Sequence, residues 1–171
     1  MKILMLIDSL DVGGAETHVE ILAEELSLMG HKIIVASGGG KLHKKLSQSK
    51  VECICLPLLQ KKHSLHSNLG FIFHFLPSLH AISKIILHTK PDIVHAHTRK
   101  TALLAHYVCK KHKIPLVVTA HALFSMKFPK NRLSKWGNGT IAVSEDIKNH
   151  LAKYGYARSQ IEVIANGVKL P

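Results

Sequence analysis

The stretch ILMLIDSLDVGGAE, residues 3–16, decides the fold of this chain. Residues 3–7 form an unbroken apolar run, which is typical of a strand that helices cover on both faces. A loop with Gly13 and Gly14 follows, and apolar residues then recur at helical spacing until Gly30, which is well placed to end a helix. A strand that leads into a helix in this way predicts the first unit of a parallel sheet, because parallel strands need a crossover between them.

The same alternation continues along the rest of the sequence and predicts an α/β fold with a parallel sheet. Further strands are expected at residues 33–37, 51–56, 92–97, 115–121, 139–144 and 161–168. Helices are expected at about 15–29, 42–48, 68–88, 100–112 and 145–153, with polar loops at 60–67 and through 131. Pro77 should start, kink or divide the third helix, since it lacks a backbone N–H group. The glutamates of the first helix should lie mostly on its outer side: Glu16, Glu20, Glu24 and Glu25.

The composition is that of one globular domain, with 46% apolar and 20% charged residues among 171. The first apolar run is too short for an export signal, and no stretch approaches the roughly 20 apolar residues of a membrane span. We therefore expect a cytoplasmic protein whose three cysteines, Cys53, Cys55 and Cys109, are buried, reduced thiols.

The formal net charge of +12 favours an anionic partner. Phosphorylated metabolites, nucleic acid and an acidic membrane surface all fit that charge. Nucleic acid is disfavoured, because aromatic and basic residues do not interleave as they do in a recognition module.

Open parallel sheets bind ligands beyond the carboxyl ends of their strands, and the first such end carries Gly13-Gly14-Ala15-Glu16. Glycines let a ligand approach the backbone, and the helix that begins here offers unpaired N–H groups to phosphate or to sugar hydroxyls. Glu16 could accept bonds from hydroxyls, or it could only complement the helix dipole in a tight turn. The spaced glycines of the dinucleotide fingerprint are missing, which disfavours a nicotinamide or flavin enzyme.

Histidines stand at the ends of two later strands, in His95-Ala96-His97 and in Thr119-Ala120-His121. Residues two apart on a strand share a face, so His95 and His97 should be neighbours. Such histidines can bond hydroxyls, take a proton or stabilise a phosphate. Two or three of them could also bind zinc, but no carboxylate or cysteine has matching spacing, so we predict no metal site.

Five segments of the sequence resemble, in the same order, those of glycosyltransferase family four: MKILMLIDSLDVGGAE, PDIVHAH, VVTAH, AVSE and IANGV. The resemblance implies the GT-B fold and transfer of sugar from an activated nucleotide donor with retention of configuration. It implies that residues 1–171 are a single domain, the N-terminal, acceptor-side half with a Rossmann-like doubly wound sheet. The donor-binding C-terminal domain of the family would then be absent from this chain.

The resemblance also implies roles for individual residues. His121 corresponds to the residue implicated in acceptor binding and catalysis. The substrate-binding positions implied are Gly13, Gly14, Glu16, His97, Ser144 and Glu145. Ser144 could instead be only the cap of the helix that follows it. Ala122 departs from the family pattern, in which glycine commonly follows the histidine.

These expectations describe a hexosyl-type glycosyltransferase that uses a nucleoside-diphosphate sugar, needs no metal or other cofactor, and acts in cell-envelope glycan or glycolipid synthesis. The isolated domain should be inactive, because half of the cleft is missing. The acceptor would be a sugar or a lipid-linked molecule, with peripheral contact to anionic membrane through Lys41, Lys44, Lys45, Lys61 and Lys62. The alternative is a non-catalytic binding subunit that works with a separate donor-binding chain.

Overall fold

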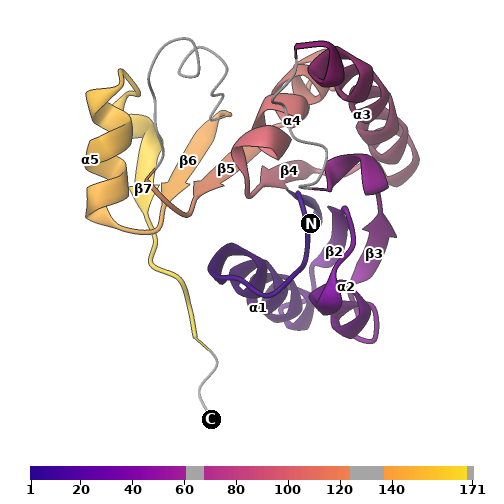
Figure 1. Cartoon of the computed structure of the whole chain (residues 1–171). Coiled ribbons are helices and arrows are strands. Elements are labelled where there is room, and N and C mark those ends of the chain that lie inside the picture. The colour runs from indigo at the N-terminus through magenta and orange to yellow at the C-terminus, as the bar shows by residue number, and fades with distance from the viewer. Residues whose placement is uncertain (61–67, 124–136, 169–171) are drawn as a thin grey trace.

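The computed structural model describes residues 1–60, 68–123 and 137–168. Within these residues the chain forms one sheet of seven strands, all parallel, in the order β3-β2-β1-β4-β5-β6-β7 (Figure 1). The strands are β1 Lys2–Ile7, β2 Lys32–Ser37, β3 Glu52–Cys55, β4 Ile93–Ala96, β5 Leu116–Ala120, β6 Gly139–Ala142 and β7 Ile161–Val163. The helices are α1 Gly14–Leu28, α2 Lys41–Leu46, α3 Asn68–Thr89, α4 Arg99–His112 and α5 Glu145–Lys153, with short 3₁₀ turns at Pro57–Leu59 and Arg158–Gln160.

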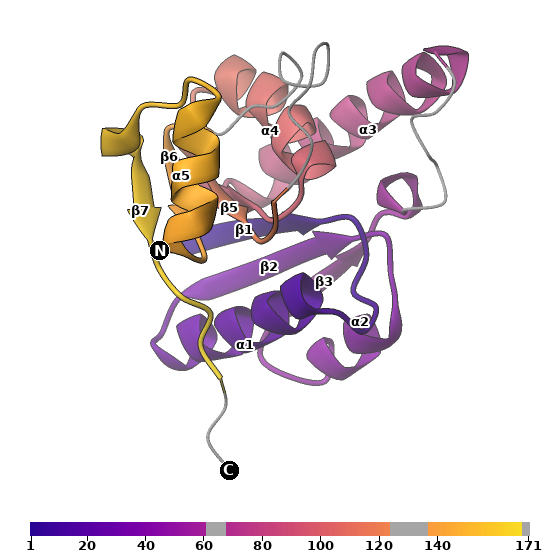
Figure 2. The ribbon, with the colours of Figure 1, turned by 60° about the vertical axis from the view of Figure 1, so that its left-hand side comes forward.

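Helices cover both faces of the sheet, as the apolar run of β1 predicts (Figure 2). Alternate residues of β1 point to opposite faces, so Met5 packs with α1 and α2, whereas Leu4 packs with α3, α4 and α5. Each face has its own buried apolar cluster. The structure therefore confirms the predicted doubly wound parallel sheet.

The strand order reverses at β1, which pairs with β2 on one side and with β4 on the other. The carboxyl ends of β1, β4 and β5 consequently lie next to one another. At such a switch point the loops leave the sheet in opposite directions and open the crevice in which ligands of these folds bind. The fold thus brings together the strand ends that the sequence singles out.

Of the three outcomes expected for Pro77, the structure excludes two: it neither starts nor divides α3, and it lies inside the helix at an exposed position. Other local expectations were wrong. The last strand ends at Val163, and residues 164–168 have no regular structure. Cys55 is exposed and Cys53 only half-buried, because β3 is the edge strand of the sheet.

The first helix buries more charge than its pattern indicates. Glu16 and Glu20 are both buried; Glu20 pairs with Lys45 of α2, and the carboxylate of Glu16 lies beside Gly13. Lys61, Lys62 and most of the two predicted polar loops lie outside the described residues. In the part of the chain that the structure describes, no helix has the length and apolar character needed to cross a membrane.

Candidate functional site

The loop between β1 and α1 is tied down at several points along its length. The glycine-rich loop after β2 holds it, with bonds from Gly38 N to Asp8 O (3.0 Å) and from Leu10 N to Gly39 O (2.8 Å). On the other side, the Thr98 hydroxyl donates to the Asp8 carboxylate at 2.7 Å and also caps α4. A loop fixed in this way presents its glycines in a defined position.

Gly13 and Gly14 differ in what surrounds them. Gly13 precedes α1 in extended conformation, and a side chain there would run into the carboxylate of Glu16. Gly14 is the first residue of α1, and nothing lies within 4 Å of the place where its Cβ would be. A side chain at Gly13 would therefore displace the Glu16 carboxylate, whereas the space beside Gly14 is open to a ligand.

The histidines predicted at the strand ends come together as expected. The His95 ring bonds the Thr119 hydroxyl at 2.7 Å between Nε2 and Oγ1 and packs against the His97 ring, with centroids 4.0 Å apart. Nδ1 of His97, a residue only 2% exposed, lies 3.3 Å from Nε2 of His121. The neighbouring strands β4 and β5 thus place two imidazoles side by side at one end of the sheet.

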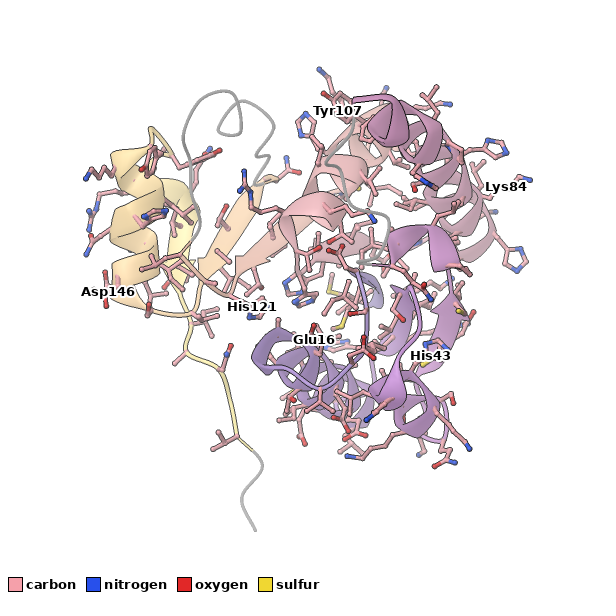
Figure 3. The ribbon with its side chains drawn as sticks, viewed as in Figure 1. Glu16, His43, Lys84, Tyr107, His121 and Asp146 are labelled. Carbon is pink, nitrogen blue, oxygen red and sulfur yellow. The ribbon has the colours of Figure 1, made fainter. Side chains whose placement is uncertain are left out.

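A third histidine, His18 of α1, completes this group and was not anticipated. Its ring centroid lies 4.9 Å from that of His121 and 5.9 Å from that of His97. The spacing from Gly14 to His18 contains a signal that could have found it, because residues four apart share a helix face. Figure 3 shows Glu16, from the same helix, and His121 at the same end of the sheet.

Burial keeps these imidazoles neutral. Desolvation lowers the pKa of His121 to about 4 and that of His95 to about 3, and it holds the pKa of His97 well below its usual range. The pKa of His18 is also lowered by burial. Glu16 raises the pKa of His121 and so opposes the effect of burial, because a nearby carboxylate favours the charged imidazole. At neutral pH the site consequently offers uncharged rings that can donate or accept hydrogen bonds.

Two ring nitrogens in this group lack a partner among the described residues: Nε2 of His97 and Nδ1 of His121, both buried. Buried polar atoms are rarely left unpaired in proteins. His18, His97 and His121 also each offer a nitrogen within 4.8 Å of the other two, close enough to surround a metal ion. The arrangement is thus suited to a hydroxyl-bearing ligand or to a metal.

Ser144 and Glu145 follow β6 at the same end of the sheet but in a different setting. The Ser144 hydroxyl accepts a bond from Ile147 N at 3.3 Å and caps α5, and Glu145 is exposed in the first turn of that helix. Ser144 therefore has the capping role that the sequence left open. The structure records neither residue in contact with the histidines, within the ranges it describes.

Comparison with known proteins places the chain in context. The model of a family described as Glycosyltransferase Family 4 matches residues 12–170. A search of curated protein sequences found no match.

Among solved structures, a glycosyltransferase from Rickettsia africae ESF-5 is 26% identical with a TM-score of 0.76, over 98% of this chain and 43% of that one. Anabaena Alr3699/HepE in complex with UDP-glucose is 20% identical with a TM-score of 0.71, over 98% and 44%. The lipopolysaccharide outer core galactosyltransferase WaaB is 19% identical with a TM-score of 0.71, over 100% and 47%. The last two show the fold alone, and the chain spans less than half the length of each of these proteins.

Proposed function

The chain belongs to Glycosyltransferase Family 4, and from this membership we propose that it forms the acceptor-side domain of a retaining glycosyltransferase. The reaction moves a hexose-type sugar from a nucleoside-diphosphate sugar to an acceptor hydroxyl. The UDP-glucose complex of the similar Anabaena protein supports the donor class. The galactosyltransferase of lipopolysaccharide outer core supports a role in cell-envelope glycan or glycolipid synthesis.

One observation carries the proposal: the neutral His97–His121 pair stands at the strand ends beside the amino end of α1. The amides that begin α1 donate to the diphosphate as negative charge develops on the leaving group, and open space at Gly14 lets the phosphate approach. Glu16 stays close by and accepts from sugar hydroxyls.

His121 acts on the reacting groups in this proposal. As a neutral ring with one nitrogen lacking a protein partner in the described ranges, it bonds a hydroxyl of the sugar or the acceptor. His97 holds the opposite nitrogen of that ring, so the orientation of His121 is set before substrate arrives. A pKa of about 4 makes His121 a weak general base, which favours orientation by hydrogen bonding over full proton abstraction.

In this proposal a second, donor-binding domain supplies the rest of the cleft, and transfer needs no metal. Support for the second domain is the length of the similar structures, of which the chain covers 43 to 47%. The isolated chain is therefore inactive on its own. If instead the chain is a binding subunit, the donor-binding part belongs to a separate polypeptide.

The location that we propose is the cytoplasmic face of a membrane. Lys41 and Lys44 are exposed on α2 beside the site, where they can meet anionic headgroups near a lipid-linked acceptor. Co-sedimentation with vesicles should then rise with the content of anionic lipid. Binding that ignores lipid charge would remove the membrane from the proposal.

The test begins with the intact mass of the polypeptide isolated from its source. A mass about twice the 18.9 kDa of this chain fits the two-domain enzyme, whereas a mass near 18.9 kDa would point to a binding subunit. The isolated polypeptide is then incubated with nucleoside-diphosphate sugars, and release of nucleotide and the anomeric form of the product are measured.

The His121→Ala variant should transfer sugar about 10²–10⁴ times more slowly if the side chain takes part in proton transfer. The loss of rate should be smaller if the side chain only orients the hydroxyl. His80→Ala is the matched control, because His80 lies exposed on α3, away from the site. Turnover of His121→Ala at the rate of the control would exclude His121 from the reaction.

A further inference from the structure

We propose that His18, His97 and His121 form a binding site for a divalent transition-metal ion of the Zn²⁺ class, and that a bound ion inhibits the site rather than serving it. The metal-binding part of this inference stands on geometry alone. The inhibitory part also rests on the proposed role of His121. The two parts are tested by separate measurements.

The spacing of the ring nitrogens matches a tetrahedral ion. With metal–nitrogen bonds of about 2.0–2.1 Å, two nitrogens on a tetrahedral zinc lie roughly 3.3–3.4 Å apart. Nδ1 of His97 and Nε2 of His121 are 3.3 Å apart, long for an N–H···N hydrogen bond. His18 supplies a third nitrogen, and the three nitrogens all lie within 4.8 Å of one another, close enough to share one ion.

The chemical state of the rings also suits a metal. When two neutral imidazoles face each other, one nitrogen donates its hydrogen and the other accepts it with its lone pair. The donating nitrogen then has no free lone pair. A metal ion that takes the place of that hydrogen accepts a lone pair from each nitrogen.

The surroundings hold the ligands in place before an ion arrives. His97 and His121 are fixed by the ends of two paired strands, β4 and β5. His95, anchored to Thr119 at 2.7 Å, packs against His97 and restricts its ring. Such outer contacts orient the ligands of metal sites.

Charge and access point to the same class of ion. A set of three imidazoles favours zinc, copper or nickel over magnesium or calcium, which prefer oxygen ligands. The buried carboxylate of Glu16, which acts electrostatically on His121, offsets part of the ion's charge. His18 and His121 are only half-buried, so the fourth coordination position is reached from solvent.

The consequence for transfer follows from the chemistry of the ring. When Nε2 of His121 binds a metal, its hydrogen stays on Nδ1 and the ring can donate but no longer accept. The ion and its water also fill the space beside the His97–His121 pair. A sugar hydroxyl that must donate to Nδ1 of His121 then finds no acceptor there.

The experiment uses this chain without a polyhistidine tag, treated with a chelator and titrated with Co²⁺, whose visible absorption bands are intense only in tetrahedral sites. The expected result is one such site per chain, from which Zn²⁺ displaces the cobalt. His18→Asn and His121→Asn should each weaken the affinity by at least about tenfold, while His80→Asn leaves it unchanged. Circular dichroism confirms that each variant is folded, and the fully buried His97 is left intact for that reason.

Absence of the tetrahedral bands, or equal affinity in all variants, would overturn the metal site. The inhibitory consequence is read separately, as loss of sugar transfer by the polypeptide isolated from its source as zinc occupancy rises. Zinc that binds without slowing transfer would contradict the role of His121 and leave the metal site standing. Failure of the transferase proposal would not change the cobalt spectrum.

Discussion

Replacing Lys45 with methionine should lower the free energy of unfolding by about 2–3 kcal/mol, because it leaves the buried carboxylate of Glu20 without its ion-pair partner. The Lys45 ammonium lies 2.5 Å from Glu20 Oε1, and no aligned hydrogen bond reaches that oxygen from any other described residue. The pair joins α1 to α2 beside the candidate site. It also engages one of the three lysines on α2 that we expected to face a membrane.

The magnitude follows from the exposure of the two partners. At 2.5 Å and an effective dielectric constant of about 20, the attraction between the charges is about 7 kcal/mol before desolvation. The Glu20 side chain is 5% exposed but that of Lys45 is 63% exposed, so water shares the ammonium and can enter once it is removed. The net loss should therefore lie between the 0–1 kcal/mol of a surface pair and the 3–5 kcal/mol of a fully buried one.

The chain contains a matched control in the Lys32–Glu52 pair. Its atoms are 3.8 Å apart and its side chains are 62% and 47% exposed, which in water corresponds to an attraction of about 1 kcal/mol. Lys32→Met should consequently cost less than about 0.5 kcal/mol, since exposed pairs contribute little.

Urea unfolding at neutral pH, followed by circular dichroism, measures both variants. Lys45→Met should lower the midpoint by about 1 M for a slope of about 2 kcal/mol/M, and Lys32→Met should hardly move it. Adding Glu20→Gln to Lys45→Met should recover part of the loss, because the buried charge is then gone. Equal losses for the two lysine variants would refute the reasoning, as would a double variant less stable than Lys45→Met alone.

Two other expectations concern the glycines and the thiols. Gly14→Ala should leave stability in urea unfolding unchanged or raise it by up to about 1 kcal/mol, because the new Cβ meets open space on a helix. Gly13→Ala should lower stability by about 1 kcal/mol, because the new side chain displaces Glu16. The same Gly14→Ala change should weaken binding of a nucleoside diphosphate in calorimetry, and unchanged binding would contradict the open approach. Iodoacetamide at about pH 8, followed by mass spectrometry, should modify the exposed Cys55 first, since burial raises the pKa of Cys53 to about 11 and that of Cys109 to about 12 and leaves little thiolate on either. Cys55→Ser should remove the fast phase, and two thiols reacting equally fast would show that β3 is not where the structure places it.

Much of the fold could be predicted from local pattern. Continuous apolar runs mark strands that are covered on both faces, and helical spacing between them requires crossovers, so the parallel sheet follows without knowledge of its strand order. The approach of His97 to His121 was predictable too. Each histidine lies at the end of a strand, and the two strands follow one another in the sequence. These properties depend on local patterns and on the order of the strands along the chain.

The errors have a common cause. Glu16 and Glu20 show an acidic face on α1, yet both are buried, and Glu20 is paired with Lys45 of α2. Cys55 alternates with Cys53 as in a core strand, but β3 has a neighbour on one side only. A repeat pattern says which side chains share a face; it does not say whether another element covers that face.

The sequence by itself therefore determined the α/β class, the position of the glycine-rich loop ahead of a helix, and the pairing of two histidines at neighbouring strand ends. Only the tertiary structure decided that α1 turns His18 toward that pair, that Lys45 is held by Glu20, and that the space beside Gly14 stays open. The physical reason is range: spacing along the chain sets the direction of a side chain within its own element. The packing of distant elements sets what that side chain meets.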